Sequence, residues 1–92
     1  MEKAFFDLTG KKAVVTGAGR GLGRDIAVGL ARYGADVMLW ARTASELEET
    51  VQLVKAEGRQ AWYETVDITD VKQTADAAAR AAQTMGRMDI LE

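Results

Sequence analysis

A cluster of glycines directly after a short β-branched run is the feature that most restricts how this chain can fold. The run covers residues 12–16, and the seven residues after it include Gly17, Gly19, Gly21 and Gly23. Glycines at the end of a buried strand let the backbone turn sharply and let a helix begin close to that strand. The N-terminus of such a helix suits a phosphate, because its N–H groups are free and it carries partial positive charge. The cluster therefore favours a nucleotide-binding turn over a ligand-free one.

Strand and helix patterns alternate along the rest of the chain. After the glycines, a helical stripe is followed by Gly34, which favours a helix end there. The expected stripe is Leu22, Ile26, Leu30 and Tyr33. Residues 36–41 then form a continuous apolar run, which is typical of a parallel strand covered on both faces.

Two further helices and two further strands are predicted. The second helix ends near Gly58 and begins at a capping box, either 43–46 or 45–48, between which the pattern does not choose. Residues 60–66 predict a strand, and Asp70 is expected to cap a third helix that ends near Gly86. The expected apolar positions are Leu47, Val51 and Val54 on the second helix and Val71, Ala75, Ala78 and Ala82 on the third. Residues 88–91 begin a fourth strand, so the order βαβαβαβ predicts an α/β fold with a parallel sheet.

Composition excludes several classes of function. The chain has 92 residues and a formal net charge of −2, so a single small domain is expected and no basic surface supports nucleic-acid or membrane binding. It has no Cys and no His, which excludes disulfides, thiol catalysis and the usual zinc sites, and we predict no metal site. No apolar run is long enough to span a membrane, and residues 1–7 lack the apolar core of a signal peptide. We therefore expect a cytoplasmic protein.

The glycine segment Thr16-Gly17-x-x-x-Gly21-x-Gly23 resembles the cofactor motif of the short-chain dehydrogenase/reductase family. Three further segments, 8–12, 67–70 and 86–91, also resemble that family, so the similarity covers nearly the whole chain. It implies a Rossmann-like parallel sheet with flanking helices, with strand order 3-2-1-4, that binds NAD(P). We expect residues 1–92 to be a single N-terminal NAD(P)-binding half of such a domain, truncated at the fourth strand. The final Leu91-Glu92 also fits a remnant of an expression vector.

The resemblance assigns roles to particular residues. It implies that the motif glycines line the pyrophosphate, that Thr16 braces the turn, and that Asp67 and the Ile68 backbone meet the adenine. A turn or capping role is the alternative for Asp67. The full set of expected cofactor-binding residues is Thr16, Gly17, Gly19, Arg20, Gly21, Leu22, Gly23, Ala41, Arg42, Asp67 and Ile68.

The residue at the end of the second predicted strand favours NADP over NAD. A carboxylate there would hold the ribose hydroxyls of NAD and repel a 2′-phosphate, but this chain has Ala41. Arg42 follows it and Arg20 lies in the glycine segment, so two guanidinium groups could hold the phosphate. Solvated surface arginines are the alternative. Ala41 also argues against S-adenosylmethionine, another ligand of glycine-rich α/β loops.

No catalytic residue can be assigned. The family transfers hydride between NADP and an alcohol or ketone with a Tyr-x-x-x-Lys pair, a Ser and an Asn, but Tyr33 and Tyr63 lack the Lys and the chain has no Asn. We therefore expect an NADP-binding fragment without activity of its own, and activity with the missing half supplied in trans has no support in the sequence. The alternative is a self-associating scaffold without appreciable cofactor binding. The fourth strand is expected at a sheet edge, where pairing with another copy predicts a dimer or higher oligomer.

Overall fold

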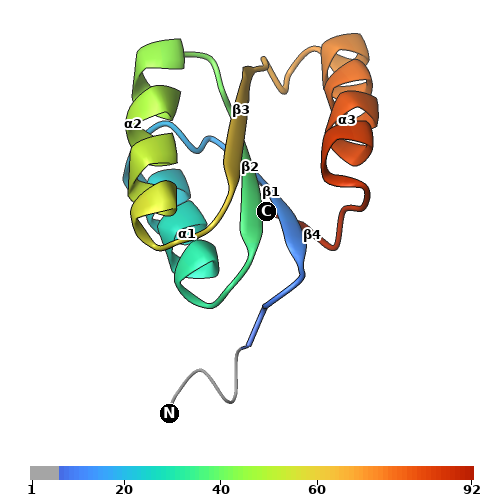
Figure 1. The fold of residues 1–92 in the computed structure, drawn as a ribbon. Coiled ribbons are helices and arrows are strands. Elements are labelled where there is room, and N and C mark those ends of the chain that lie inside the picture. The colour runs from blue at the N-terminus through green and yellow to red at the C-terminus, as the bar shows by residue number, and fades with distance from the viewer. Residues whose placement is uncertain (1–6) are drawn as a thin grey trace.

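The computed structural model describes residues 7–92, which form a parallel sheet between two layers of helices (Figure 1). The strands are β1 (Lys12–Thr16), β2 (Asp36–Ala41), β3 (Ala61–Thr65) and β4 (Ile90–Leu91), and the helices are α1 (Gly21–Arg32), α2 (Ala44–Ala56) and α3 (Val71–Met85). α1 and α2 cover one face of the sheet and α3 covers the other. The strand order is β3-β2-β1-β4, which confirms the predicted α/β Rossmann-like fold.

β1 and β2 form the buried centre of the sheet. They pair in parallel from Lys12 opposite Asp36 to Thr16 opposite Trp40. Their middle residues have almost no exposed surface, because helices cover both faces. Both strands have the predicted bounds, since continuous apolar runs of this length are characteristic of strands buried on both sides.

The two faces of the sheet carry separate hydrophobic cores. The core beneath α1 and α2 consists of Val15, Ala18, Ala27, Ala31, Val37, Leu39, Leu47, Val51 and Val54. The core beneath α3 consists of Val14, Met38, Trp40, Val66, Ala77, Ala81 and Met85, with Trp62, Ala78 and Met88 packed against it. All three predicted apolar positions of α2 are in the first core. Adjacent residues of β1 and β2 thus enter opposite cores, as the alternation of side chains along a strand requires.

The predicted apolar face of α1 is only partly correct. Ile26 and Leu30 are partly buried against the first core, but the fully packed positions are Ala27 and Ala31. Small side chains face the sheet because α1 begins close to β1. Leu22 lies in the first turn of the helix and is 75% exposed, so its predicted place in the core is wrong.

The predicted apolar face of α3 is wrong at three of its four positions. Val71 is 82% exposed, Ala75 and Ala82 are also exposed, and Ala78 is partly buried. The buried positions are instead Ala77, Ala81 and Met85, which recur every four residues. Alanine occurs on several sides of this helix, so the alanine pattern alone cannot choose a face. Met85 is the long apolar side chain that reaches the core.

Capping groups fix the ends of the helices. The Asp70 carboxylate accepts a hydrogen bond of 3.0 Å from the N–H of Gln73, which confirms the predicted cap of α3. Gly86 ends this helix in the left-handed conformation, with φ of 81°. Thr43 occupies the N-cap position of α2 without a side-chain capping bond, so the helix begins at the first of the two predicted positions but not through a capping box.

A buried carboxylate ties the amino ends of β1 and β2 to the segment before β3. Asp36 Oδ2 accepts a hydrogen bond from Lys12 Nζ at 2.5 Å. Asp36 Oδ1 accepts a hydrogen bond from the N–H of Gln60 at 3.1 Å and lies 2.9 Å from the Arg59 guanidinium. Burial raises the pKa of Asp36, but the bonds from Lys12 and Gln60 and the charge of Arg59 outweigh it and bring the pKa below its ordinary value. This ion cluster lies at the opposite end of the sheet from the glycine segment.

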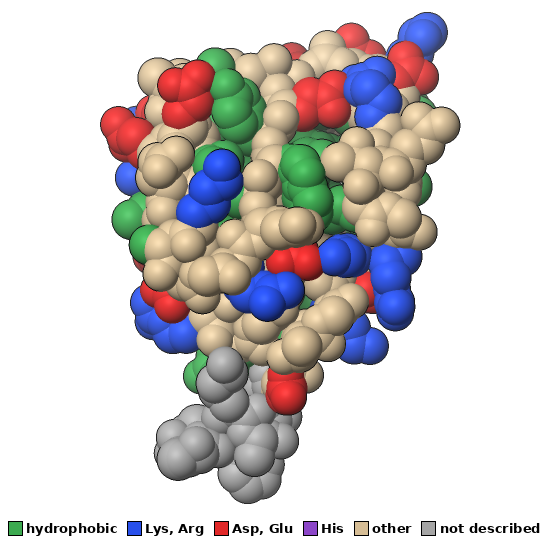
Figure 2. All heavy atoms as spheres, in the orientation of Figure 1, with side chains coloured by type: hydrophobic (Ala, Val, Ile, Leu, Met, Phe, Trp, Pro, Cys, Tyr) green, Lys and Arg blue, Asp and Glu red, His purple; other side chains and the backbone are tan. Residues whose placement is uncertain are grey.

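Charged side chains of both signs are interspersed on the visible face of the molecule, and hydrophobic side chains show between the sheet and α3 (Figure 2). No helix among residues 7–92 has the length and apolar character required to cross a bilayer. Residues 1–6, which make up most of the segment predicted to lack a signal peptide, lie outside the described residues.

Candidate functional site

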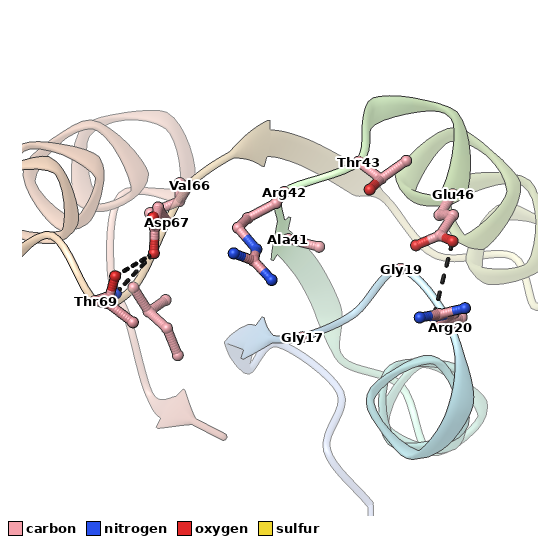
Figure 3. Close-up of a pocket in the computed structure, with 11 residues that line it drawn as sticks. Gly17, Gly19, Arg20, Ala41, Arg42, Thr43, Glu46, Val66, Asp67 and Thr69 are labelled. Atoms are coloured by element: carbon pink, nitrogen blue, oxygen red, sulfur yellow. Dashed lines mark hydrogen bonds and ion pairs between the residues drawn. The ribbon is translucent and has the colours of Figure 1, made fainter.

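The carboxyl ends of β1, β2 and β3 surround a cavity of about 380 Å³ (Figure 3). This volume is within the range of small-molecule sites in proteins. The lining residues are Gly17, Gly19, Arg20, Ala41, Arg42, Thr43, Glu46, Val66, Asp67, Ile68 and Thr69. In a parallel α/β sheet this edge is where ligands bind, because the strand ends and the helix N-termini meet there.

The backbone conformation of the glycine segment disfavours larger residues at two positions. Gly17 has φ of 62°, in the left-handed region that disfavours side chains. A Cβ added to Gly23 would lie 1.9 Å from the carbonyl oxygen of Gly17, so only glycine allows α1 to start this close to the turn. No side chain caps the N-terminus of α1, and its first turn has no acidic residue. This end of the helix therefore suits an anion.

Arg24 and Thr50 hold the glycine segment against α2. The Arg24 guanidinium donates hydrogen bonds to the carbonyl oxygens of Gly19, at 2.6 Å, and of Glu46, at 3.1 Å, and its Nε donates to Thr50 Oγ1 at 2.9 Å. The buried Thr50 hydroxyl donates to the carbonyl oxygen of Ala18 at 2.8 Å. These bonds fix two successive carbonyls of the turn. Neither residue is predictable from the sequence, because their partners are backbone atoms distant in sequence.

Two arginines and two carboxylates line the cavity. Arg20 is 83% exposed, and its Nε lies 3.8 Å from Glu46 Oε2. Arg42 extends from the end of β2 into the space between α2 and the segment after β3 (Figure 3). Opposite it lies Asp67, which accepts bonds from the hydroxyl and the N–H of Thr69 at 2.6 and 3.0 Å. The Thr69 hydroxyl and then its N–H lower the pKa of Asp67 and outweigh burial, which raises it; the charge of Arg42 lowers it by the least.

The structure brings most of the predicted site residues to this cavity. Those that line it are Gly17, Gly19, Arg20, Ala41, Arg42, Asp67 and Ile68. Thr16, Gly21, Leu22 and Gly23 lie next to it in the chain without lining it, and the Thr16 hydroxyl donates to the carbonyl oxygen of Glu92 at 3.1 Å. Lining residues absent from the predicted set are Thr43, Glu46, Val66 and Thr69. Of these, Thr43 and Glu46 carried a capping signal in the sequence, and Thr69 is part of the 67–70 segment.

Neither tyrosine lines the cavity. Tyr63 projects from β3 and donates a hydrogen bond of 2.8 Å to Glu48, which, with burial as the smaller effect, raises the pKa of Tyr63. Tyr33 follows the last residue of α1, at the other end of that helix from the glycine segment. The described residues also contain no group of three or more acidic, His or Cys side chains that could hold a metal ion.

Known proteins are similar to this chain in both sequence and fold. The short chain dehydrogenase family profile matches residues 11–92. Gluconate 5-dehydrogenase from Gluconobacter oxydans is 44% identical over 86 residues, which are 94% of this chain and 34% of that protein. Carveol dehydrogenase from Mycobacterium avium, solved in complex with NAD, is 33% identical with a TM-score of 0.87, over 92% of this chain and 35% of the other. A short-chain type dehydrogenase/reductase from Mycobacterium marinum is 30% identical with a TM-score of 0.91, over 99% and 37% of the two chains.

The chain therefore belongs to the short-chain dehydrogenase family, whose members are oxidoreductases that bind nicotinamide dinucleotides. It spans about a third of the length of the curated relatives that it matches.

The cavity residues fit a dinucleotide. Cβ atoms built on Gly17 and Gly21 would meet nothing within 4 Å, so both face open space, and the clash at Gly23 keeps α1 close to the turn. α1 begins directly after the cavity-lining Arg20, and no side chain caps its N-terminus. The small Ala41 and the adjacent Arg42 line the same cavity. When bound, a nicotinamide dinucleotide would supply hydride transfer.

Proposed function

We propose that residues 1–92 form the N-terminal NADP(H)-binding half of a short-chain dehydrogenase/reductase domain. In this proposal the glycine segment and the N-terminus of α1 hold the pyrophosphate, and Asp67 with the backbone of Ile68 holds the adenine. Thr16 braces the turn, and Leu22 lies over the pyrophosphate from its exposed position. The observation that supports this most directly is that the glycine segment, Arg42 and Asp67 border one cavity.

The preference for NADP rests on the charges at the end of β2. Ala41 stands where a carboxylate would repel a 2′-phosphate, and Arg20 and Arg42 border the same cavity. Guanidinium groups form charge-assisted, often bidentate bonds to phosphate, so the pair would favour NADP. NAD is the less favoured alternative, and one structural relative was solved in complex with NAD.

We further propose that the chain has no hydride-transfer activity of its own and acts in the cytoplasm. The parent reaction would interconvert an alcohol and a ketone with NADP. Tyr33 and Tyr63 lie outside the cavity, so neither tyrosine stands in position to exchange a proton with a carbonyl group bound there.

A self-associating scaffold is the second candidate. It is favoured by the position of β4 at one edge of the sheet and by Leu91 in that strand, which is 64% exposed. An unpaired strand edge beside an apolar side chain can pair with another copy of the chain.

Calorimetric titration of the chain with NADP and with NAD tests the first proposal. We expect saturable binding that is tighter for NADP than for NAD. Arg42→Gln should bind NADP at least about tenfold more weakly, because it loses a charge-assisted hydrogen bond to the 2′-phosphate. Gly23→Ala should abolish binding, since its Cβ would displace the turn. Gly29→Ala is the matched control: it adds the same methyl group to α1 in open space and should bind like the original chain. A folded chain that binds neither dinucleotide would leave the scaffold as the better explanation.

A further inference from the structure

The side chain of Glu46 occupies the space that a side chain at position 19 would need. A Cβ built on Gly19 would lie 2.9 Å from Glu46 Oε1 and 3.0 Å from Glu46 Cβ. Gly19 is not one of the three glycines of the motif. A side chain at position 19 would displace Glu46, which lies over the glycine segment from the first turn of α2. The two positions are therefore in close contact, although they are 27 positions apart in the sequence.

The position of Glu46 is fixed by the contacts of its backbone. Its carbonyl oxygen accepts a hydrogen bond from Arg24 at 3.1 Å and lies 3.2 Å from the Thr50 hydroxyl oxygen. The carboxylate itself is about a third exposed and faces Arg20, whose Nε is 3.8 Å from Oε2. Glu46 thus presents a negative charge to the cavity at the end that Arg20 occupies (Figure 3).

Among the charged groups that line the cavity, Arg20 forms an ion pair with Glu46. Arg42 acts on Asp67 only through its charge, which is the weakest influence on the pKa of that carboxylate. A 2′-phosphate near Arg20 would have to compete with a carboxylate that already holds this guanidinium. A ribose hydroxyl has no such conflict, because it can donate a hydrogen bond to the carboxylate.

We propose that Glu46 is a specificity-determining residue that weakens the preference for NADP by competing with the 2′-phosphate for Arg20. This inference rests on the proposed dinucleotide site. If Glu46 competes in this way, Arg42 binds the 2′-phosphate more strongly than Arg20 does, because Arg20 is already engaged in an ion pair. The strength of discrimination between NADP and NAD then depends on α2 as well as on the end of β2.

The test compares dissociation constants for NADP and NAD in the 92-residue chain and in Glu46→Gln, which keeps the shape of the side chain and removes its charge. We expect the ratio of the NAD to the NADP dissociation constant to rise at least about fivefold, the effect of one unit charge at about 4 Å in water. Glu48→Gln is the matched control, because Glu48 is on the same helix and bonds to Tyr63 outside the cavity. Its ratio should change by less than about twofold. Circular dichroism verifies that each variant is folded.

A second pair of variants tests whether the effect of Glu46 on the NAD to NADP ratio depends on Arg20. In an Arg20→Gln background, Glu46→Gln should change the ratio by less than about twofold, since the competition no longer exists. An undiminished effect in that background overturns the inference, as does an unchanged ratio in Glu46→Gln itself. In both of those cases the dinucleotide site stands, because the original chain binds. A folded original chain that binds neither nucleotide overturns the proposed function and this inference with it.

Discussion

Single side chains that do not line the cavity hold the glycine segment in place through hydrogen bonds to its carbonyl groups. Thr50 is completely buried and donates a hydrogen bond to the carbonyl oxygen of Ala18 in that segment. Thr50→Val should lower the free energy of unfolding by about 1–3 kcal/mol, because a buried carbonyl loses its partner. Urea unfolding measures this change. Thr84→Val on the exposed side of α3 is the control and should stay within about 0.5 kcal/mol of the original chain.

The same substitution should also weaken NADP binding, since Ala18 and Gly19 are held by Thr50 and Arg24. A loss of stability in Thr50→Val with an unchanged NADP dissociation constant would show that the clamp serves folding alone.

The sequence predicts site residues whose type and place in a motif indicate their role. It does not predict site residues whose role depends on contact with a residue far away in the sequence. Gly17, Arg42 and Asp67 stand at places that the glycine spacing and the strand ends indicate, and all three line the cavity. Glu46 carried only a capping signal in the sequence. Its contact with the glycine segment depends on how closely α2 approaches α1, which no local pattern records.

The packed face of α3 can be tested with neighbouring positions. Ala81 is completely buried and Ala82 is exposed, although the sequence predicted Ala82 on the apolar face. Ala81→Gln should destabilise the chain by about 2 kcal/mol or more, because it adds volume and an unpaired amide to the core. Ala82→Gln should change the free energy of unfolding by less than about 0.5 kcal/mol. Equal effects in urea unfolding would contradict the packing seen here.

The ion cluster at the start of β2 gives stability a defined dependence on pH. The pKa of Asp36 is lower in the folded chain than its ordinary value of about 3.9 in an unfolded one. Folding therefore favours the ionised form, and this contribution is fully present above about pH 4 and is lost as pH falls through the folded pKa.

Asp36→Asn should lower the free energy of unfolding by about 1–3 kcal/mol at pH 7, and by less as the pH falls toward 3. The control is Asp76→Asn, which removes an exposed i,i+4 pair with Lys72 and should cost about 0.5 kcal/mol or less. Thermal unfolding from pH 3 to 7 measures both variants. A pH-independent loss in Asp36→Asn would show that its charge is unimportant.

Strands were easier to predict than helix faces in this chain, for a physical reason. A strand buried on both sides needs an uninterrupted apolar run, and residues 36–41 provide one with clear ends. The third strand was predicted to include residue 66 and ends at Thr65, although Val66 is buried. A helix needs only one apolar stripe, and repeated alanines in α3 satisfy more than one.

Self-association is a prediction for the 92-residue chain. The edge strand β4 has only Ile90 and Leu91, and Leu91 is largely exposed. We expect a dimer or higher oligomer at micromolar concentrations by light scattering. Leu91→Lys should shift the population toward monomer, because a charged side chain on an edge strand opposes pairing. A monomeric mass for the original chain at all concentrations would contradict this prediction.

The division of the interior into two cores also makes tryptophan fluorescence specific for one of them. Both tryptophans, Trp40 and Trp62, belong to the core beneath α3, and the core beneath α1 and α2 has none. Trp40 is almost completely buried, so its emission should be blue-shifted while α3 is docked. Fluorescence therefore reports on one layer of the molecule, whereas far-ultraviolet circular dichroism reports on all three helices. If α3, which docks through two alanines and one methionine, detaches first, the fluorescence transition will precede the dichroism transition.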